Sequence, residues 1–280
     1  MIHYIYQFSK LIRAHNIALS ILSSLIVANL ISFNDIKLIV ISAMIISLVM
    51  ASGNIINDYY DIKIDMVEHP SRPLPNNIFS QKFIFLIMFV LVVLIFILSL
   101  FVNEMARKTL YIGIIPPLYL YSIFLKKIPL INNLIIAYLL GMVFMFNEIV
   151  FVNSFSLLML PALLAFGLSF IRELIKDIDD YHGDKKFNIY TIPVILGISN
   201  ARYIAIILII IFQCLCILPY YLNILSYKYF ISLIFLIEIP LCFVLSLLFN
   251  NPNKRTFSKL VIYTKWITFG GLVVIFLSYN

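Results

Sequence analysis

The sequence predicts an all-α, polytopic membrane protein, and three observations support this prediction. Of the 280 residues, 63% are hydrophobic and only 12% are charged, whereas a soluble domain has about 25% charged residues. The apolar residues form runs long enough to cross a bilayer, which takes about 20 residues of helix. Lys and Arg are also distributed unequally between alternate connections. Because lipid offers no partner to exposed backbone polar groups, helices are the expected spanning elements.

Nine apolar runs can be delimited, so we expect nine transmembrane helices in a bundle around a central cavity, within one domain over residues 1–280. The prolines Pro116 and Pro117 predict a kink in the fourth run, because neither can donate to the helical ladder. The runs cover approximately residues 11–33, 36–57, 83–102, 109–125, 130–152, 155–175, 202–222, 229–249 and 260–278.

The basic residues predict the orientation of these helices. With a cytoplasmic N-terminus, 16 of the 20 Lys and Arg residues fall on the cytoplasmic side, as the positive-inside rule requires. We therefore expect a multi-pass protein of the cell membrane whose C-terminus lies outside. The same bias explains the net charge of +7, so we expect contact with membrane lipid and no nucleic-acid partner.

Two connections are long, and both lie on the cytoplasmic side in this topology. They cover approximately residues 58–82, between the second and third helices, and 176–201, between the sixth and seventh. Long loops in compact proteins are usually functional. We expect these two loops to form a cytoplasmic cap that carries the active site.

The acidic residues concentrate in these two loops. Nine of the 13 Asp and Glu residues lie in segments 54–69 and 172–184. Each segment contains the spacing D-x-x-D-x-x-x-D, and Asp179 lies outside that register. The two sets are Asp58, Asp61 and Asp65, and Asp177, Asp180 and Asp184.

This spacing places three carboxylates on one face of a helix, where they repel one another unless a cation offsets the repulsion. Hard cations such as Mg²⁺ bind carboxylate oxygens and keep room for water and phosphate. Two such faces at one cavity would hold metal ions on either side of a diphosphate and stabilise it as a leaving group. Asn54 and Glu173 lie four residues before each set and extend its face.

Local signals predict where these helices end. No proline interrupts residues 54–69, so the second helix should continue as far as Pro70. Gly183 should end the other helix early and leave Asp184 on a loop. Glu148, inside the fifth run, is costly in lipid and should face the cavity or a polar partner.

Other interpretations of the acidic segments are a set of solvated loop acids, a calcium loop and a cation transporter. A calcium-binding EF-hand has alternating acids and a terminal Glu, which neither segment has. A transporter would bind its cation near the bilayer midplane, whereas these acids lie at the ends of the apolar runs. A CDP-alcohol phosphotransferase would continue its motif as D-G-x-x-A-R, unlike Asp61-Ile62-Lys63.

The two segments resemble the signatures of the UbiA-type intramembrane prenyltransferase family. Residues 57–65 match N-D-x-x-D-x-x-x-D, and residues 180–184 match D-x-x-x-D. The resemblance implies a Mg²⁺-dependent enzyme that transfers a prenyl group from an isoprenyl diphosphate to a lipid-like or aromatic acceptor. It also implies nine transmembrane helices with both motifs on the cytoplasmic side.

Further segments are similar to this family. Arg13-Ala-His-Asn16 resembles R-P-x-N with Ala14 in place of proline, and Asn132-Asn133 resembles a G-N pair with Asn132 in place of glycine. The resemblance implies that Asn54, Asn57 and Glu173 complete or orient the metal shell. It implies substrate contacts for the residues of the matching segments and for their neighbours, namely Arg13, Asn16, Arg72, Tyr121, Lys126, Arg172 and Lys176, with Arg72 and Lys126 on diphosphate oxygens.

Residues 172–184 are most similar to the geranylgeranylglycerol-phosphate geranylgeranyltransferase branch of the family, with Asp179 in place of Glu. This similarity implies geranylgeranyl diphosphate and geranylgeranylglyceryl phosphate as substrates in ether-lipid synthesis. An aromatic acceptor such as 4-hydroxybenzoate, homogentisate or naphthoate, as in quinone biosynthesis, is the alternative. The cations Arg172, Lys176, Lys185 and Lys186 suit a phosphate-bearing acceptor, but they also fit the positive-inside bias.

Overall fold

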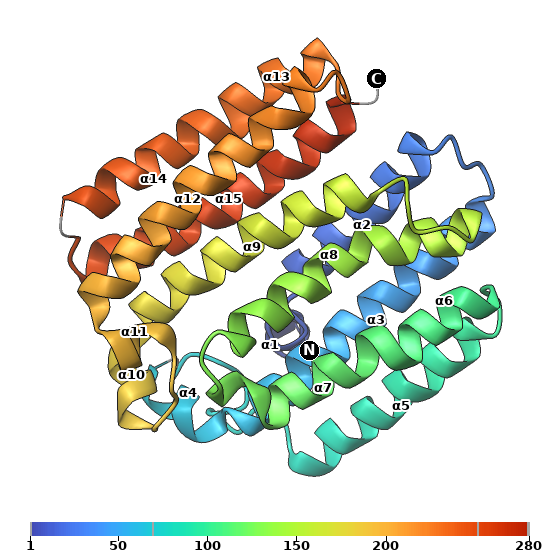
Figure 1. Ribbon diagram of the computed structural model, residues 1–280. Helices are drawn as coiled ribbons and strands as arrows, with labels where there is room; N and C mark the ends of the chain where they lie inside the picture. Colours follow the sequence, from blue (N-terminus) through green and yellow to red (C-terminus); the bar gives the residue numbers. More distant parts are fainter. Residues whose placement is uncertain (1, 69, 251, 279–280) are drawn as a thin grey trace. The chain divides into compact units, whose positions relative to one another are not determined.

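The computed structural model describes residues 2–68, 70–250 and 252–278. These residues form helices joined by turns and loops, and no β-strand occurs among them (Figure 1). The all-α prediction is therefore confirmed. The chain divides into two compact units, Met1–Lys126 with Met142–Met159, and Lys127–Gly141 with Leu160–Asn280. Helix α8 contributes its first half to the second unit and its second half to the first.

In the first unit, α3 packs against α2, α5 and α7. Gly53 allows the close approach of α7, since a Cβ at this position would lie 2.6 Å from Leu118 Cδ1. The helices of this unit are α1 (Ile2–Leu11), α2 (Ala14–Leu30), α3 (Ile36–Tyr60), α4 (Ile62–Glu68), α5 (Gln81–Ser99), α6 (Glu104–Lys108), the π-helix η1 (Thr109–Ile114), α7 (Ile115–Ile123), the 3₁₀ turn η2 (Leu125–Lys127), and the second half of α8 (Ile131–Val152).

Polar residues begin several of these helices. The Asp35 carboxylate accepts from the amides of Lys37 and Leu38 at 2.9 and 3.3 Å and caps α3. Ser80 caps α5 by accepting from Phe83 N. Such caps satisfy N–H groups that a helix leaves without an internal partner. Short polar connections therefore mark the helix boundaries that hydropathy leaves approximate.

In the second unit, the first half of α8 packs closely on α9. A Cβ on Gly141 would lie 2.9 Å from the carbonyl oxygen of Ala162, so only glycine permits this approach. The helices that follow α8 are α9 (Met159–Asp179), α10 (Tyr181–Lys186), α11 (Ile192–Leu196), α12 (Ile198–Tyr221), α13 (Tyr227–Leu233), the π-helix η3 (Ile234–Glu238), α14 (Ile239–Phe249) and α15 (Lys254–Ser278).

Six helices of the described chain are long and apolar enough to cross a membrane: α3, α5, α8, α12, the stretch Tyr227–Phe249, and α15. The pair His3–Leu11 and Ala14–Leu30, which meets at 60°, makes a seventh span if it counts as one. The multi-span prediction is thus confirmed, and the count of nine stays a prediction. Of the other expected spans, 155–175 corresponds to α9, and 109–125 is divided into η1 and α7.

A π-helical turn, η1, lies directly before Pro116 and Pro117, which occupy the first turn of α7. The second π-helix, η3, likewise lies directly before Pro240 in the first turn of α14. Proline has no N–H to continue an i→i−4 ladder, and a π-turn rearranges the bonds of the preceding residues. The prolines thus alter the local hydrogen bonding of two helices that otherwise continue.

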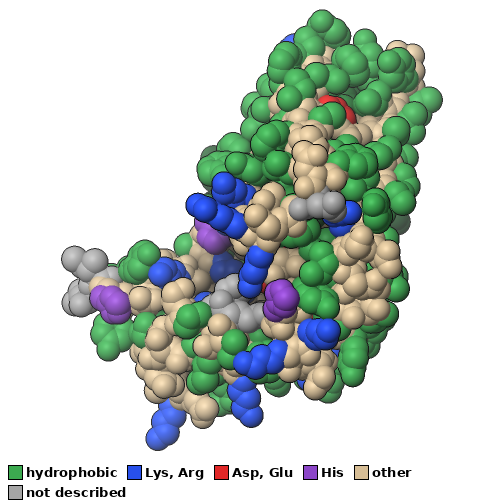
Figure 2. Space-filling model, turned by 90° about the vertical axis from the view of Figure 1, so that its left-hand side faces the viewer, with side chains coloured by type: hydrophobic (Ala, Val, Ile, Leu, Met, Phe, Trp, Pro, Cys, Tyr) green, Lys and Arg blue, Asp and Glu red, His purple; other side chains and the backbone are tan. Residues whose placement is uncertain are grey.

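The surface fits an environment of lipid. On α5, Phe85, Phe89 and Phe96 are 60, 67 and 56% exposed, which would be costly in water. Figure 2 shows hydrophobic side chains covering broad areas of one face, while Lys and Arg side chains gather in one part of it. This separation is expected of a protein whose apolar exterior contacts the bilayer.

Glu148 is fully buried near the end of α8 and has polar partners, as predicted. Its carboxylate accepts from the backbone amides of Ser156, Leu157 and Leu158, each at 2.8 Å. Beside it, Asn147 accepts from Ser42 Oγ at 2.7 Å and donates to the carbonyl of Val143. These bonds fix the connection from α8 towards α9, because charge-assisted bonds to three amides are strong.

Candidate active site

The first acidic set, Asp58, Asp61 and Asp65, lies where α3 ends. α3 stops at Tyr60, Asp61 takes non-helical dihedrals (φ −94°, ψ 2°), and α4 begins at Ile62. The prediction of one helix continuing to Pro70 was therefore wrong. The break separates the acids, since Asp58 belongs to α3 and Asp65 to α4. The two carboxylates therefore lie on helices that are not continuous with each other.

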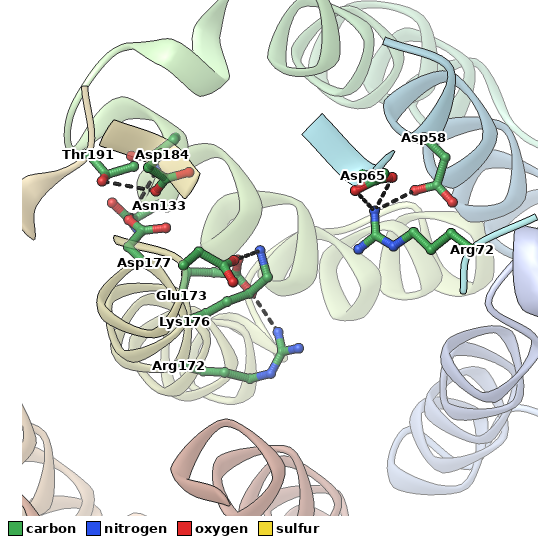
Figure 3. Close-up of polar contacts among 12 residues, drawn as sticks. Asp58, Asp65, Arg72, Asn133, Arg172, Glu173, Lys176, Asp177, Asp184 and Thr191 are labelled. Carbon is green, nitrogen blue, oxygen red and sulfur yellow. Dashed lines mark hydrogen bonds and ion pairs between the residues drawn. The ribbon is translucent and has the colours of Figure 1, made fainter. Parts of the chain in front are cut away.

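Two arginines hold the outer members of this set. Arg72 Nη1 donates to Asp65 Oδ2 and Oδ1 at 2.7 and 2.9 Å and lies 3.4 Å from Asp58 Oδ1 (Figure 3). Arg13 Nη2 donates to the same Asp58 oxygen at 2.8 Å. Both carboxylates are buried, with 3 and 2% of their residues exposed. Buried carboxylates need such charged donors to offset the loss of hydration.

Apolar neighbours bring the two arginines to Asp58. Leu11, Ile55 and Leu74 belong to one buried cluster with Ile84. Leu11 lies two residues before Arg13, Ile55 three before Asp58, and Leu74 two after Arg72. Burial of these side chains therefore draws three distant segments to one point.

Arg13 also marks the bend between α1 and α2. Its backbone is left-handed (φ 53°, ψ 59°), a conformation that costs a non-glycine residue about 1 kcal/mol. Asn54 supports this bend, since its Nδ2 donates to the carbonyl of Ile12 at 3.0 Å. Asn54 thus positions the segment that carries Arg13.

The charges shift the pKa values of this set. Burial raises the pKa of Asp65, and the charge and hydrogen bond of Arg72 offset part of that rise, so that the pKa is about 6. Burial alone would lower the pKa of Arg72, but Asp58 and Asp65 raise it above its usual value. Arg72 therefore remains a cation.

The remaining predicted residues of the first unit differ in their contacts. Lys126 forms an ion pair with Asp61 Oδ1, and both side chains are largely buried. The carbonyl of Asn57 accepts from Asp61 N at 3.0 Å, and the amide of Asn16 donates to Arg13 O at 2.8 Å. Tyr121 is half-buried on α7.

The second acidic set is broken at the same place as the first. α9 ends at Asp179, Asp180 takes non-helical dihedrals (φ −82°, ψ 2°), and α10 begins at Tyr181. Asp184 therefore lies on α10 together with Gly183, so the prediction that Gly183 leaves Asp184 on a loop was wrong. In both sets the break falls at the middle acid.

Neutral side chains hold the two most buried acids of this set. Asn132 and Asn133 both donate to Asp177 Oδ2, at 3.1 and 2.8 Å. Thr191 Oγ1 donates to Asp184 Oδ2 at 3.1 Å. Figure 3 shows Asn133, Asp177, Asp184 and Thr191 as one group. Asp177 and Asp184 are only 7 and 8% exposed, yet the amides and the hydroxyl that donate to their carboxylates are uncharged.

The charged partners of the second set lie at its more exposed edge. Lys176 Nζ pairs with Asp180 Oδ2 at 3.2 Å, and the Lys176 side chain is 40% exposed. Arg172 Nη1 donates to Glu173 Oε1 at 2.5 Å. Burial, together with the negative charges of Asp177 and Asp180, raises the pKa of Asp184 to about 7.

Asp179, outside the register of the set, has a different partner. Its Oδ1 accepts from Ser258 Oγ at 2.8 Å, which ties the end of α9 to the first turns of α15. Ile178 and Phe257, the neighbours of these two residues, are buried in the apolar core of this unit. Ile192, next to Thr191, belongs to the same core.

The donor chemistry of both sets suits a hard divalent cation. Among residues 2–68, 70–250 and 252–278, no three His, Cys, Asp or Glu side chains lie close enough to hold a metal ion by themselves. Mg²⁺ usually takes one or two carboxylates together with water and phosphate oxygens. Buried carboxylates with raised pKa values, Asp65 and Asp184, would gain from such a cation.

Three contacts were missed by sequence reasoning. Asn132, Thr191 and Ser258 are ordinary polar residues that meet an acid 45, 7 and 79 positions away in the chain. Two adjacent amides at the start of an apolar run were a usable signal for Asn132. Nothing local singles out Thr191 or Ser258.

The chain is similar to known proteins over nearly its whole length. The model of the UbiA prenyltransferase family matches residues 17–269. Digeranylgeranylglyceryl phosphate synthase of Methanobrevibacter smithii is 31% identical over 277 residues, which cover 96% of this chain and 95% of that protein. A solved structure of digeranylgeranylglyceryl phosphate synthase is 31% identical, covers 99% of both chains, and has a TM-score of 0.75.

A more distant structure shares the fold. A UbiA homolog from Archaeoglobus fulgidus, bound to GPP and Mg²⁺, is 18% identical, with a TM-score of 0.68 over 96% of this chain and 99% of its own. The family predicted from the two aspartate motifs is therefore confirmed. The chain belongs to the UbiA prenyltransferase family.

Proposed function

We propose that this protein transfers the geranylgeranyl group of geranylgeranyl diphosphate to geranylgeranylglyceryl phosphate and releases diphosphate, in a Mg²⁺-dependent reaction of ether-lipid synthesis. The observation that carries the proposal is the pair of buried carboxylate sets in one register, in a chain related over nearly its full length to digeranylgeranylglyceryl phosphate synthases. The Archaeoglobus relative bound to GPP and Mg²⁺ supports the donor and the metal.

In this proposal Asp58, Asp61 and Asp65, together with Asp177, Asp180 and Asp184, hold Mg²⁺, and Asn54, Asn57 and Glu173 orient the carboxylates. Bound Mg²⁺ neutralises charge on the diphosphate as the C–O bond breaks. Apolar and aromatic side chains shield the allylic cation from water. The acceptor hydroxyl then attacks C1, diphosphate leaves, and the hydroxyl proton passes to the leaving diphosphate or to a carboxylate of the sets.

Arg13, Arg72 and Lys126 bind the diphosphate oxygens. Each already contacts a carboxylate of the first set, so each lies beside the proposed metal ligands. The contacts of Arg72 with both acids involve only Nη1. Its other N–H groups can therefore donate to phosphate while those contacts persist, which suits the planar, multi-donor guanidinium. Asn16 and Tyr121 lie in the neighbouring segments and contact the substrate.

The membrane arrangement is part of the proposal. The chain forms one domain over residues 1–280, with nine transmembrane helices around a central cavity and a cytoplasmic cap of the 2–3 and 6–7 loops. The N-terminus and both acidic sets are cytoplasmic, and the C-terminus is outside. The six or seven apolar helices and the Lys and Arg distribution support this topology.

The phosphate-bearing acceptor is favoured over an aromatic one by the cations near the second set. Arg172, Lys176, Lys185 and Lys186 lie on α9 and α10, and the side chains of Arg172 and Lys176 are 24 and 40% exposed. Cations of this kind bind a phosphate group, which carries more negative charge than the single carboxylate of an aromatic acceptor such as 4-hydroxybenzoate.

Purified protein incubated with geranylgeranyl diphosphate tests the proposal, with either geranylgeranylglyceryl phosphate or 4-hydroxybenzoate as acceptor, with and without Mg²⁺. We expect diphosphate release and a doubly prenylated product only with the glyceryl phosphate and Mg²⁺. Product from 4-hydroxybenzoate alone would establish the aromatic alternative. Absence of transfer to either acceptor, with metal transport into vesicles, would establish a cation transporter.

A further inference from the structure

Two adjacent amides share one oxygen of the second acidic set. Asn132 and Asn133 lie in the first turn of α8, and the Nδ2 atoms of both donate to Asp177 Oδ2. The close packing of α8 on α9 at Gly141 and Ala162 fixes the two helices against each other in this unit. The amides therefore reach Asp177 from a rigid element.

The opposite ends of both amides have no partner. Asn132 and Asn133 are 6 and 1% exposed, and the Oδ1 atom of each is buried without a hydrogen bond among the described residues. A buried acceptor without a partner costs about 1–3 kcal/mol, and native proteins contain few of them. Two such atoms next to a proposed metal ligand point to a bound group that donates hydrogen bonds.

A contrasting asparagine on the same helix shows that this arrangement is specific. Asn147 is fully buried too, but its Oδ1 accepts from Ser42 Oγ and its Nδ2 donates to Val143 O. On α8, the buried amide oxygen of Asn147 therefore has a partner where no acid set is near. Within α8 (residues 131–152), buried side-chain oxygens without a partner occur only at the end that contacts Asp177.

We propose that Asn132 and Asn133 form a pair of acceptors for the water ligands of a divalent cation held by Asp177 and its set. This inference rests on the proposed function, which requires that cation. The amide N–H groups hold Asp177 Oδ2, and the amide oxygens accept from water on the cation. Mg²⁺ suits this role because it retains several of its waters when bound to protein.

This arrangement gives the second set a way to select a hydrated cation without further charge. Groups that orient metal ligands typically contribute 10- to 100-fold to metal affinity. The pair extends the site beyond its carboxylates, which by themselves provide no triad of acidic ligands among the described residues. A cation whose hydration shell has a different size would place its water ligands away from the two amide oxygens and would lose these hydrogen bonds.

The test is Mn²⁺ binding to the full-length purified chain, measured by electron paramagnetic resonance. All variants also carry Asp58→Asn, so that the second set dominates the signal. We expect Asn132→Ala and Asn133→Ala each to weaken Mn²⁺ binding about 10-fold, and the double variant by up to about 100-fold. Asn147→Ala is the matched control, and it should lower thermal stability without changing Mn²⁺ affinity.

A second comparison separates acceptance of water from positioning of Asp177. In an Asp177→Asn background, the Asn132 and Asn133 substitutions should still weaken Mn²⁺ binding, because the amide oxygens act on the water of the cation. If the Asn132 and Asn133 substitutions no longer changed Mn²⁺ affinity in this background, the inference would be overturned. The two amides would then serve only to position Asp177. Unchanged affinity in the double variant, with normal Mn²⁺ binding and prenyl transfer by the parent chain, would overturn it without touching the proposed function. A parent chain that binds no Mn²⁺ would overturn both.

Discussion

The two acidic sets share a spacing and a helix break but differ in their partners. In the first, Arg13, Arg72 and Lys126 face the three carboxylates. In the second, amides and a hydroxyl hold Asp177 and Asp184, and the ion pair of the set joins Lys176 to Asp180. One sequence pattern thus occurs in two electrostatic environments.

This difference suggests a division of labour in the proposed reaction. The first set is near electrical balance, so its cations can bind phosphate oxygens at little electrostatic cost. In the second set, neutral donors hold Asp177 and Asp184, so the negative charge of these two acids is left to favour a divalent cation. Each prediction below changes one partner and measures whether phosphate affinity or metal affinity responds.

The largest effect is expected from the acids themselves. Asp58→Asn and Asp177→Asn should each lower kcat/KM about 10³-fold or more, since metal ions supply several kcal/mol of stabilisation in the transition state. Both variants should also raise the Mg²⁺ concentration needed for half-maximal activity, and Asp177→Asn should raise it more. Glu104→Gln, which removes an exposed carboxylate on α6, is the control. Full activity in either Asp variant would contradict the assigned metal roles.

A smaller effect is expected for Arg72→Lys. One ammonium group cannot reproduce contacts to Asp58, Asp65 and phosphate together, so KM for the prenyl diphosphate should rise about 10- to 100-fold. The Mg²⁺ dependence should stay unchanged. Arg255→Lys, at an exposed position of α15, serves as the control, and steady-state kinetics measure both. A changed Mg²⁺ requirement with normal KM would reverse the division of labour.

Thr191 tests the neutral support of the second set. Thr191→Val keeps the shape of the side chain but removes the bond to Asp184, which is worth about 1 kcal/mol, and kcat/KM should fall about 5-fold. Thr191→Ser should restore it. The requirement for Mg²⁺, measured by titration, should rise in the valine variant. Equal behaviour of the valine and serine variants would show that the hydroxyl has no role.

The smallest effect is expected for the tie between α9 and α15. Ser258→Ala and Asp179→Ala should each lower stability by about 1 kcal/mol or less, and the double variant should cost no more than the larger of the two. Thermal unfolding in detergent measures this coupling. Activity should stay within about 2-fold of the parent, and a large loss would place Asp179 among the metal ligands.

Much of the helical pattern could be predicted, because long apolar runs and the bilayer thickness constrain it strongly. The breaks at Asp61 and Asp180 could not. Neither position carries Pro or Gly, and at Gly183, where a signal for ending a helix exists, α10 continues. Tertiary contacts at these positions outweigh local propensity.

The acids of the site followed from their spacing, whereas their neutral partners did not. A repeated motif is visible within one segment, but the contact of Asn132 with Asp177 joins residues 45 positions apart. Hydrogen bonds of this kind depend on how α8 packs on α9, and hydropathy contains no information about that packing. Arg72 and Lys126 were found only because their segments resemble those of related proteins.

The bonds of Glu148 have a consequence for biosynthesis. Its carboxylate depends on amides that follow it by 8 to 10 residues, so α8 is synthesised before its own acid has a partner. A charged side chain near the centre of a helix costs about 3 kcal/mol on membrane insertion, and less towards the ends. Glu148 gains these partners only once residues 156–158 have also been synthesised, so the end of α8 and the connection that follows it are stabilised together.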